Sequence, residues 1–419
     1  MSKKKEIIPE LRFPEFRNEG EWEIIKLKQF GTFYRGLTYG AADTASNGLL
    51  VLRSGNIQND TLILNNDLVF VDKECPENLK LLNGDIVICM SNGSKTLVGK
   101  NAEYKGNYEG EITVGAFCSI LRPKNNFTKY LLQSDIYQDF IALSIGGGNI
   151  NNLKNSDLEE FSCSAPKNRK EQQKIASCLS SLDNLIDAYN QNMDLLQAHK
   201  QGLMQILFPQ VGEKVPKYRF KEFEKDGVWT EKSLDEVATI LKGKGISKAD
   251  IVEDGDLPCI RYGELYTHYK ETIRTVKSYT NSNADDLVLS KANDVIIPAS
   301  GETQIDIATA SCVLESGIAL GSDLNIIRSK INGVFLSYYL NNSKKHDIAQ
   351  MAQGIAVVHL YPNQLKTLQL QIPSTKEQIK IASCLSSLDE IISTQVEKIE
   401  HLKQHKKGLM QVLFPKIID

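Results

Sequence analysis

Hydrophobic residues recur at alternating spacings of three and four in two stretches of the chain, residues 171–207 and 377–413. A period of 3.5 residues is typical of a helix that pairs with another helix along an apolar seam. Prolines flank both stretches, as expected at helix boundaries. The pattern therefore predicts two helices of about 35 residues, each about 50 Å long. The seam residues are Ile175, Leu179, Leu182, Ile186, Tyr189, Met193, Leu196, Leu203 and Leu207, then Ile381, Leu385, Leu388, Ile392, Ile399, Leu402, Leu409 and Leu413.

Three polar residues interrupt this seam. Lys200 and Lys406 occupy the same seam position in the two stretches, and Gln395 occupies another position in the second stretch.

The two predicted helices belong to a tandem duplication. Glu171–Asp183 reappears as Glu377–Asp389, and about 23 of 39 positions are identical between residues 171–209 and 377–415. An opening segment repeats as well. Leu11–Phe16 and the tryptophan that follows it match a second segment at Tyr218–Phe223. The duplicated unit is therefore roughly 206 residues long.

The segments between these landmarks, residues 20–165 and 227–372, have diverged. Both contain short β-prone runs separated by glycine and asparagine turns, and a short helix is expected after the last strand of each. We predict a compact globule for each segment and a mixed α/β (α+β) fold for the chain. In the first globule the predicted strands are Leu49–Leu52, Thr61–Leu64, Leu68–Val71, Asp85–Cys89 and Phe117–Leu121. The predicted helix lies near Lys129–Phe140 in the first globule and near Val334–Met351 in the second.

Two similar helices in one chain bury their seams most easily by pairing with each other. Because a globule separates them in sequence, an antiparallel pair would place one globule at each end. The sequence thus predicts two globular domains separated by two long antiparallel coiled-coil helices, with pseudo-two-fold symmetry. The predicted boundaries are 1–166, 167–209, 210–373 and 374–419.

Composition narrows the function class only slightly. The net charge of −3 does not indicate a nucleic-acid protein, but binding depends on where the basic residues lie. The chain has no apolar run of membrane-spanning length and no apolar stretch behind its charged start. Its eight cysteines form no CxxC pair, which favours reduced thiols. We therefore expect a cytoplasmic protein without a membrane partner.

Pseudo-two-fold symmetry is also how DNA-binding dimers read two half-sites at a fixed spacing. Here the two globules differ in sequence, so the half-sites should differ. The organisation predicts an asymmetric, bipartite DNA target with an unread gap.

The doubled opening and the doubled helix segment closely resemble the specificity subunit of type I restriction–modification systems, over essentially the whole chain. The resemblance rests on Pro9–Phe16, its second copy at Pro216–Phe223, and the EQQKIAxxLSSLD…GLMQxLFP helices of both halves. The second opening reads YRFKEF where the first reads LRFPEF.

The resemblance implies that each globule is a target-recognition domain and that the helices act as a molecular ruler. It implies double-stranded DNA, two methyltransferase subunits and, through the complex, restriction subunits as partners. The chain itself would be non-catalytic and bind no cofactor, since S-adenosylmethionine, ATP and Mg would be used by the other subunits.

Candidate base readers are polar and basic residues in the diverged segments. Arg53 and Arg261 have an alternative structural interpretation, because both copies keep an arginine while specificity should vary. The candidates are Arg35, Arg53, Asn56, Ser91, Asn92, Ser94, Lys95, Asn149, Asn151 and Asn152 in the first globule, and Lys242, Lys244, Arg261, Tyr262, Glu264, Ser300, Glu302, Thr303, Gln304, Gln353 and His359 in the second.

Identity between the two copies is concentrated at the helix ends, which suggests two docking surfaces for two copies of one partner. Packing of each end on its own globule would explain the same identity. The docking candidates are Lys174, Leu179, Leu182, Leu203, Met204, Lys380, Leu385, Leu388, Leu409 and Met410.

Catalytic motifs are weak. Gly93–Asn101 has the wrong spacing for a nucleotide-binding P-loop, and Glu103–Lys105 is only a fragment of a nuclease signature. The six histidines form no metal-ligand pattern. A single-chain restriction–methylation enzyme and a coiled-coil protein-binding scaffold remain alternative interpretations; the first lacks its motifs, and the second leaves the two diverged globules unexplained.

Overall fold

The computed structural model describes residues 7–145, 152–210, 212–354 and 357–415. These residues form two compact units: unit 1 comprises the described residues up to 189 and from 398 onwards, and unit 2 comprises those between 190 and 397. Each unit therefore contains one globule and one part of each long helix. Among the residues described, no helix combines the length and hydrophobicity that crossing a bilayer requires.

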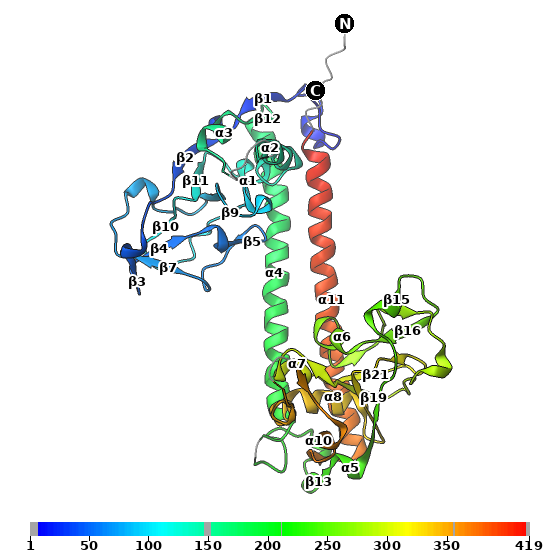
Figure 1. Cartoon of the computed structure of the whole chain (residues 1–419). Coiled ribbons are helices and arrows are strands. Elements are labelled where there is room, and N and C mark those ends of the chain that lie inside the picture. Colours follow the sequence, from blue (N-terminus) through cyan, green and yellow to red (C-terminus); the bar gives the residue numbers. More distant parts are fainter. Residues whose placement is uncertain (1–6, 146–151, 211, 355–356, 416–419) are drawn as a thin grey trace. The chain divides into compact units, whose positions relative to one another are not determined.

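The two long helices are α4 (Arg169–Leu207) and α11 (Thr375–Leu413), within two residues of the predicted starts. In unit 1, the first half of α4 lies beside the last turns of α11, because Asp183 forms an ion pair with Lys406. In unit 2, Lys200 of α4 pairs with Asp389 of α11. The early part of each helix thus meets the late part of the other, which confirms antiparallel pairing within each unit (Figure 1).

Unit 1 is built on two four-stranded sheets with the orders β2-β11-β8-β9 and β10-β4-β7-β3. Two small antiparallel pairs, β1-β12 and β5-β6, complete its strands. The strands are β1 (Glu23–Lys26), β2 (Gly31–Arg35), β3 (Thr44–Ala45), β4 (Leu49–Leu52), β5 (Ile57–Gln58), β6 (Thr61–Leu62), β7 (Val69–Val71), β8 (Ile86–Cys89), β9 (Asn101–Glu103), β10 (Ile112–Val114), β11 (Cys118–Pro123) and β12 (Ser162–Ala165), and the short helices are α1 (Phe127–Leu131), α2 (Asp135–Ile145) and α3 (Asn155–Glu160).

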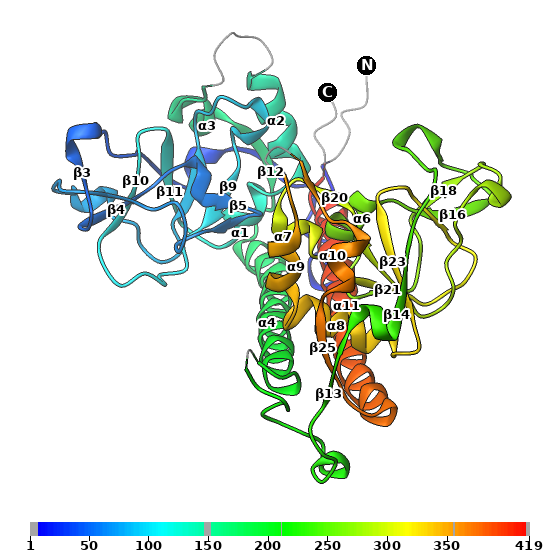
Figure 2. The ribbon, with the colours of Figure 1, turned by 60° about the horizontal axis from the view of Figure 1, so that its bottom comes forward.

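Unit 2 repeats this plan with a five-stranded sheet, β14-β23-β19-β21-β17, and a four-stranded sheet, β15-β18-β16-β22. Figure 2 shows α7, α9 and α10 grouped together, with α9 packed on both α7 and α10. The strands are β13 (Thr230–Ser233), β14 (Ala238–Lys242), β15 (Ile251–Val252), β16 (Leu257–Ile260), β17 (Thr272–Ile273), β18 (Ser278–Thr280), β19 (Asp294–Pro298), β20 (Ser300–Gly301), β21 (Ser311–Val313), β22 (Ala319–Leu320), β23 (Leu324–Ser329), β24 (Val358–His359) and β25 (Gln369–Ile372), and the helices are α5 (Leu234–Val237), α6 (Tyr262–Thr267), α7 (Gln304–Ile307), α8 (Gly333–Asn342), α9 (Lys345–Met351) and α10 (Pro362–Lys366).

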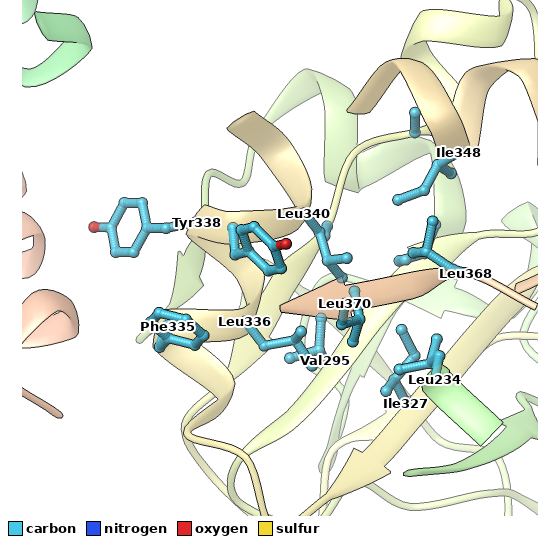
Figure 3. Packing of buried hydrophobic residues seen from close by; sticks show 14 of the residues in the cluster. Leu234, Val295, Ile327, Phe335, Leu336, Tyr338, Leu340, Ile348, Leu368 and Leu370 are labelled. Atoms are coloured by element: carbon cyan, nitrogen blue, oxygen red, sulfur yellow. The ribbon is translucent and has the colours of Figure 1, made fainter. Parts of the chain in front are cut away.

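A helix near the end of each globule is confirmed, but each unit has two short helices there. They are α1 and α2 in unit 1, and α8 and α9 in unit 2. In unit 2, α8 contributes Phe335, Leu336 and Leu340 to one apolar cluster with Val295 and Ile327 of the larger sheet, and Leu336 lies toward Val295 (Figure 3). The start of α11 contributes Ile381 and Leu385 to the same core. The helix seam and the globule core are therefore one continuous apolar body in this unit.

A buried ion pair recurs in both units between the central strands. Arg122 of β11 contacts Asp85 at 2.8 Å, and Arg328 of β23 contacts Asp294 at 2.7 Å. Both carboxylates are 2% exposed. The repeated pair shows that the two diverged segments keep the same backbone arrangement. We call this shared arrangement of strands and connecting segments the frame.

Candidate nucleic-acid interface

In unit 1, three chain segments meet at one end of the β2-β11-β8-β9 sheet. Ser91, just after β8, forms an isolated β-bridge with Asn152. The amide of Asn92 donates to Ser54 Oγ at 2.9 Å, and Asn92 Oδ1 accepts from the Ser94 backbone at 3.0 Å. The structure thus brings together Ser91, Asn92, Ser94 and Asn152, and places Lys95 in the 3₁₀ turn that follows.

Unit 2 builds the same junction with different side chains. Ser300 pairs with His359 in the β20-β24 ribbon, where Ser300 Oγ lies 3.1 Å from His359 Nδ1. Gln353 also bridges to His359. Thr303 accepts a hydrogen bond from the Asp306 backbone at 3.1 Å and so caps α7, which begins at Gln304. Five predicted readers of the second globule, with Gln304 among them, therefore share this junction.

A basic residue ends the edge strand of the main sheet in each unit. Arg35 ends β2 opposite Ser119, and Lys242 ends β14 opposite Asn325. Both basic side chains are exposed, as is Lys244 two residues later. Arg35 and Lys242 hold matching positions in the repeated frame, so the frame keeps a positive charge there in both copies.

Several predicted readers have structural roles that compete with base contact. Asn56 is 1% exposed, accepts from the Arg53 backbone at 2.8 Å and donates to backbone carbonyls. Arg53 binds Asp67 at 2.6 Å. Arg261 contacts Glu264 at 3.4 Å, and that carboxylate is also bound by Ser278. We leave Asn56 and Glu264 out of the proposed interface, because burial removes them from a ligand.

Three further candidates need separate mention. Tyr262 is half-buried, with its ring centroid 6.5 Å from that of Tyr266. Glu302 is exposed. The DNA phosphates would repel its carboxylate, so the base group that suits it is the amino group of cytosine, which can donate a hydrogen bond to it. Asn149 and Asn151 lie outside the described residues.

The proposed docking residues are largely engaged within their own units. Leu179 and Leu385 are 0% exposed, and Leu388 and Met410 are 8% exposed. Lys174 contacts Glu15 at 3.2 Å, and Lys380 contacts Glu222 at 3.1 Å, so each lysine ties a helix to its opening segment. Identity at these positions thus has a packing reason, and we do not carry them into a docking proposal. The remaining candidates, Leu182, Leu203, Met204 and Leu409, are half-buried, the last three against the unit cores.

The lysines that break the seam are ion-pair partners across it. Lys406 Nζ lies 2.6 Å from Asp183 Oδ1, and Lys129 lies 2.8 Å from the other oxygen. Burial lowers the pKa of Lys129, but the Asp183 carboxylate outweighs this and raises it above the ordinary value. Burial raises the pKa of Asp183, yet Lys129 and Lys406 hold it below the ordinary value. Lys129 and Asp183 are therefore both charged at neutral pH.

The matching cluster in unit 2 has a different charge balance. Lys200 Nζ lies 2.8 Å from Asp389 and 3.1 Å from Glu271, and Tyr338 donates to Asp389. One cation here serves two carboxylates. Sequence alone contained the signal for both clusters, since Lys200, Lys406 and the two aspartates are identical repeat positions that antiparallel pairing brings together.

A second repeated cluster ties each opening segment to its helix. Arg12 makes two hydrogen bonds of 2.8 Å to Glu171, and Trp22 Nε1 donates to the same carboxylate at 3.3 Å. Arg219, Trp229 and Glu377 form the same arrangement in unit 2. These contacts explain why the opening motif and the glutamate recur together.

The segments that suggested catalysis have structural partners. Lys100, the lysine of the P-loop-like stretch, donates to the Ile57 carbonyl at 2.6 Å. Glu103 contacts Lys129 at 3.1 Å, and Lys105 contacts Asp187 at 2.5 Å. In the part of the chain that the structure describes, no cluster of three His, Cys, Asp or Glu side chains could hold a metal ion.

One arrangement in unit 2 superficially resembles a hydrolytic triad. Ser300 Oγ contacts both His359 Nδ1 and, at 3.3 Å, Asp323 Oδ1. A triad needs the carboxylate on the far nitrogen of the imidazole, where it orients the base. Here both partners contact the hydroxyl, and Ser300 is only 8% exposed, so the geometry fits a structural network instead.

Comparison with known proteins agrees with this two-unit organisation. A family model described as the type I restriction modification DNA specificity domain matches residues 19–197 and again residues 227–404. The EcoKI specificity subunit of Escherichia coli (strain K12) is 30% identical over 195 residues, 44% of this chain and 41% of that protein. The putative MjaX specificity subunit of Methanocaldococcus jannaschii is 24% identical over 413 residues, 94% of this chain and 92% of that protein. The match to EcoKI thus covers about two fifths of that relative's length, whereas the match to MjaX is almost complete.

Solved structures agree on the fold. The S subunit of a type I restriction–modification system from M. genitalium superposes with a TM-score of 0.60 at 14% identity, over 98% of this chain and 100% of that one. A chain from a structure concerning complex assembly and conformational transition of the type I R-M system gives a TM-score of 0.53 at 14% identity, over 95% and 98% of the two chains. With both of its repeats matched by the family model, the chain belongs to the type I restriction–modification DNA specificity family.

Proposed function

We propose that this chain selects the DNA sequence on which a type I restriction–modification complex acts, with one half-site read by each unit. The observation that carries the proposal is the shared junction. The bridge between Ser91 and Asn152 in unit 1 has the same place in the frame as the bridge between Ser300 and His359 in unit 2. A fixed backbone with exchanged side chains is what two readers of different sequences require.

Comparing matching positions of the two units distinguishes DNA contacts that do not depend on base sequence from contacts that do. Phosphate contacts position a protein on DNA, and base-edge contacts specify the sequence. Arg35 and Lys242 keep a charge at one frame position, so we assign them to phosphates. Positions that change between units are assigned to base edges: Asn92, Lys95 and Asn152 in unit 1, and Gln304, Gln353 and His359 in unit 2.

Two equivalent helix surfaces would dock two methyltransferase subunits. Ser177 and Ser181 of α4 are exposed, and the identical Ser383 and Ser387 of α11 are exposed in unit 2. Packing inside the units gives no reason for that identity. In unit 1 these serines line a groove of about 550 Å³ with Lys124–Phe127 at its rim. We infer that this groove and the surface around Ser383 and Ser387 in unit 2 receive the partner.

Chemistry would belong to those partners. The proposed role gives this chain no reacting group, so S-adenosylmethionine, ATP and Mg would be bound by the methyltransferase and restriction subunits. Purified alone, the chain is expected neither to methylate nor to cleave DNA. Turnover by a preparation free of other subunits would overturn this part of the proposal.

The direct test is to express the chain with a type I methyltransferase subunit from the same genome and to sequence the methylated bases of the host DNA. The proposal predicts one motif with two unlike specified parts separated by unspecified positions. The same methyltransferase without this chain should leave no motif. A single continuous motif, or methylation independent of the chain, would contradict the proposal.

A further inference from the structure

Phe117 is a large aromatic side chain exposed at the proposed interface of unit 1. Its exposed fraction is 71%, while the residues around it in sequence, Cys118 and Ile120, are 0% exposed. The Phe117 carbonyl accepts backbone hydrogen bonds from Met90 at 2.9 Å and from Ser91 at 3.2 Å. The aromatic residue is therefore directly beside the junction that holds the proposed readers.

The backbone that presents Phe117 is tightly held. The Cys118 amide donates to the Gly115 carbonyl at 2.8 Å, and the Gly36 amide donates to the Cys118 carbonyl at 3.0 Å. A Cβ at Gly36 would lie 2.2 Å from the Gly115 oxygen, so only glycine allows this close approach of the two loops. The ring thus projects from a turn braced on both sides.

The fold itself does not require an aromatic residue there. The matching position of unit 2 holds Asp323, whose backbone carbonyl accepts from Ala299 at 2.7 Å, as the Phe117 carbonyl accepts from Met90. Asp323 keeps the turn and replaces the ring with a carboxylate. The ring is consequently a feature of one reading unit and not of the shared frame.

The segments that adjoin Phe117 carry polar and basic residues, which distinguishes its setting from the centre of a protein–protein interface. Ser91, Asn92, Asn152 and Arg35 come from the adjoining segments, whereas protein interfaces usually surround an aromatic anchor with further apolar residues. A single rigid apolar side chain set among polar and basic groups is how DNA-bending proteins insert a wedge between base pairs.

We propose that Phe117 stacks into the duplex at the half-site read by unit 1 and partly unstacks one base step. This inference rests on the proposed DNA-reading function. Insertion would make recognition by unit 1 depend on how easily that step deforms, in addition to the hydrogen bonds of its neighbours. Unit 2, with Asp323 at the matching position, would read its half-site without a wedge.

The test uses the full chain assembled with its methyltransferase subunit and a duplex that carries the methylated motif. The fluorescent base 2-aminopurine replaces one base at a time across the unit 1 half-site, and affinity is measured by fluorescence anisotropy. For the wild type, fluorescence should change on binding at one step only. Phe117→Ala should abolish that change and raise Kd about tenfold, as expected for loss of one stacked base contact.

Two matched variants separate stacking from general effects. Phe117→Trp should keep both the affinity and the fluorescence change. Leu82→Ala removes another exposed apolar side chain of unit 1, 52% exposed and located before β8, at the opposite end of the sheet, and should bind within about twofold of wild type.

The outcomes are distinct. If the wild-type complex does not prefer the motif duplex over a scrambled one, the proposed function fails and the inference fails with it. If the wild type prefers the motif but Phe117→Ala binds within about twofold, or keeps the fluorescence change, only the wedge is overturned. Loss of binding that Phe117→Trp does not restore would also overturn stacking.

Discussion

Lys406 of α11 and Asp183 of α4 form a 2.6 Å ion pair at a position where the helix seam would otherwise be apolar. The repeat places Lys200 and Asp389 in the same relationship in unit 2, at 2.8 Å. All four side chains are at most 20% exposed. Polar pairs in an apolar seam disfavour other registers and directions, because any other pairing would leave a buried charge without a partner.

The two seam lysines should differ in their contribution to stability. Lys200→Met leaves Asp389 and Glu271 without a cation and should destabilise unit 2 by about 3–4 kcal/mol. Lys406→Met leaves Lys129 on Asp183 and should cost unit 1 about 1–2 kcal/mol. Urea denaturation followed by hydrogen exchange in peptides of each unit measures both. Lys403→Met, on the exposed face of α11, is the control. Equal losses for Lys200 and Lys406 would refute this charge argument.

The unit 1 cluster also predicts a pH dependence. Because the folded pKa of Asp183 lies below its unfolded value, its contribution is present above about pH 4 and is lost as pH falls through the folded pKa. Lys129 has a raised pKa, so its contribution to the unfolding free energy is present up to about pH 10.5 and is lost as the pH rises further. Asp183→Asn should be less stable at neutral pH and lose less on acidification. Titration of the unfolding free energy from about pH 3 to pH 6 checks this; an acid limb unchanged in the variant would count against it.

Blocking one serine surface should change the stoichiometry of the complex. Ser181→Trp fills the unit 1 groove and Ser387→Trp fills the equivalent surface of unit 2. Native mass spectrometry should show one methyltransferase subunit lost with each single variant and both lost with the double variant. Ser393→Trp, exposed on α11 where the repeats have diverged, should keep two subunits. Two bound subunits in the double variant would exclude this docking surface.

If the helices act as a ruler, their length should set the unread gap. Inserting seven residues into the diverged middle of both α4 and α11 preserves the 3.5-residue seam and adds about 10.5 Å, or about three base pairs. The methylated motif should keep both specified parts and widen its gap. The same insertion in α4 alone breaks the register and should lower the yield of folded chain. An unchanged gap with paired insertions would argue against a ruler.

The sequence predicted the periodic parts of this protein well. The 3.5-residue pattern located α4 and α11, because the apolar residues of paired helices recur at a fixed spacing. The duplication located the shared frame, because matching segments recur at a nearly constant distance along the chain. Separating core from surface at the helix ends was harder: Leu179 and Leu385 are identical because each fills its own core. Individual loop side chains were least predictable. Asn56 is buried because it accepts from the Arg53 backbone and donates to the carbonyls of Asn66 and Asp67 in the loop that follows. Phe117 was predicted as part of a strand, although it lies in an exposed turn before β11.

The central claim is that each unit reads its own half-site through a common frame. Replacing residues 20–165 with a copy of residues 227–372 tests it most directly, because both repeats of the chain then carry the second globule. Sequencing of methylated bases should show the half-site of unit 1 lost, that of unit 2 retained, and an inverted copy of the unit 2 half-site in place of the missing one. An unchanged motif, or loss of both original half-sites with active methylation, would contradict the claim.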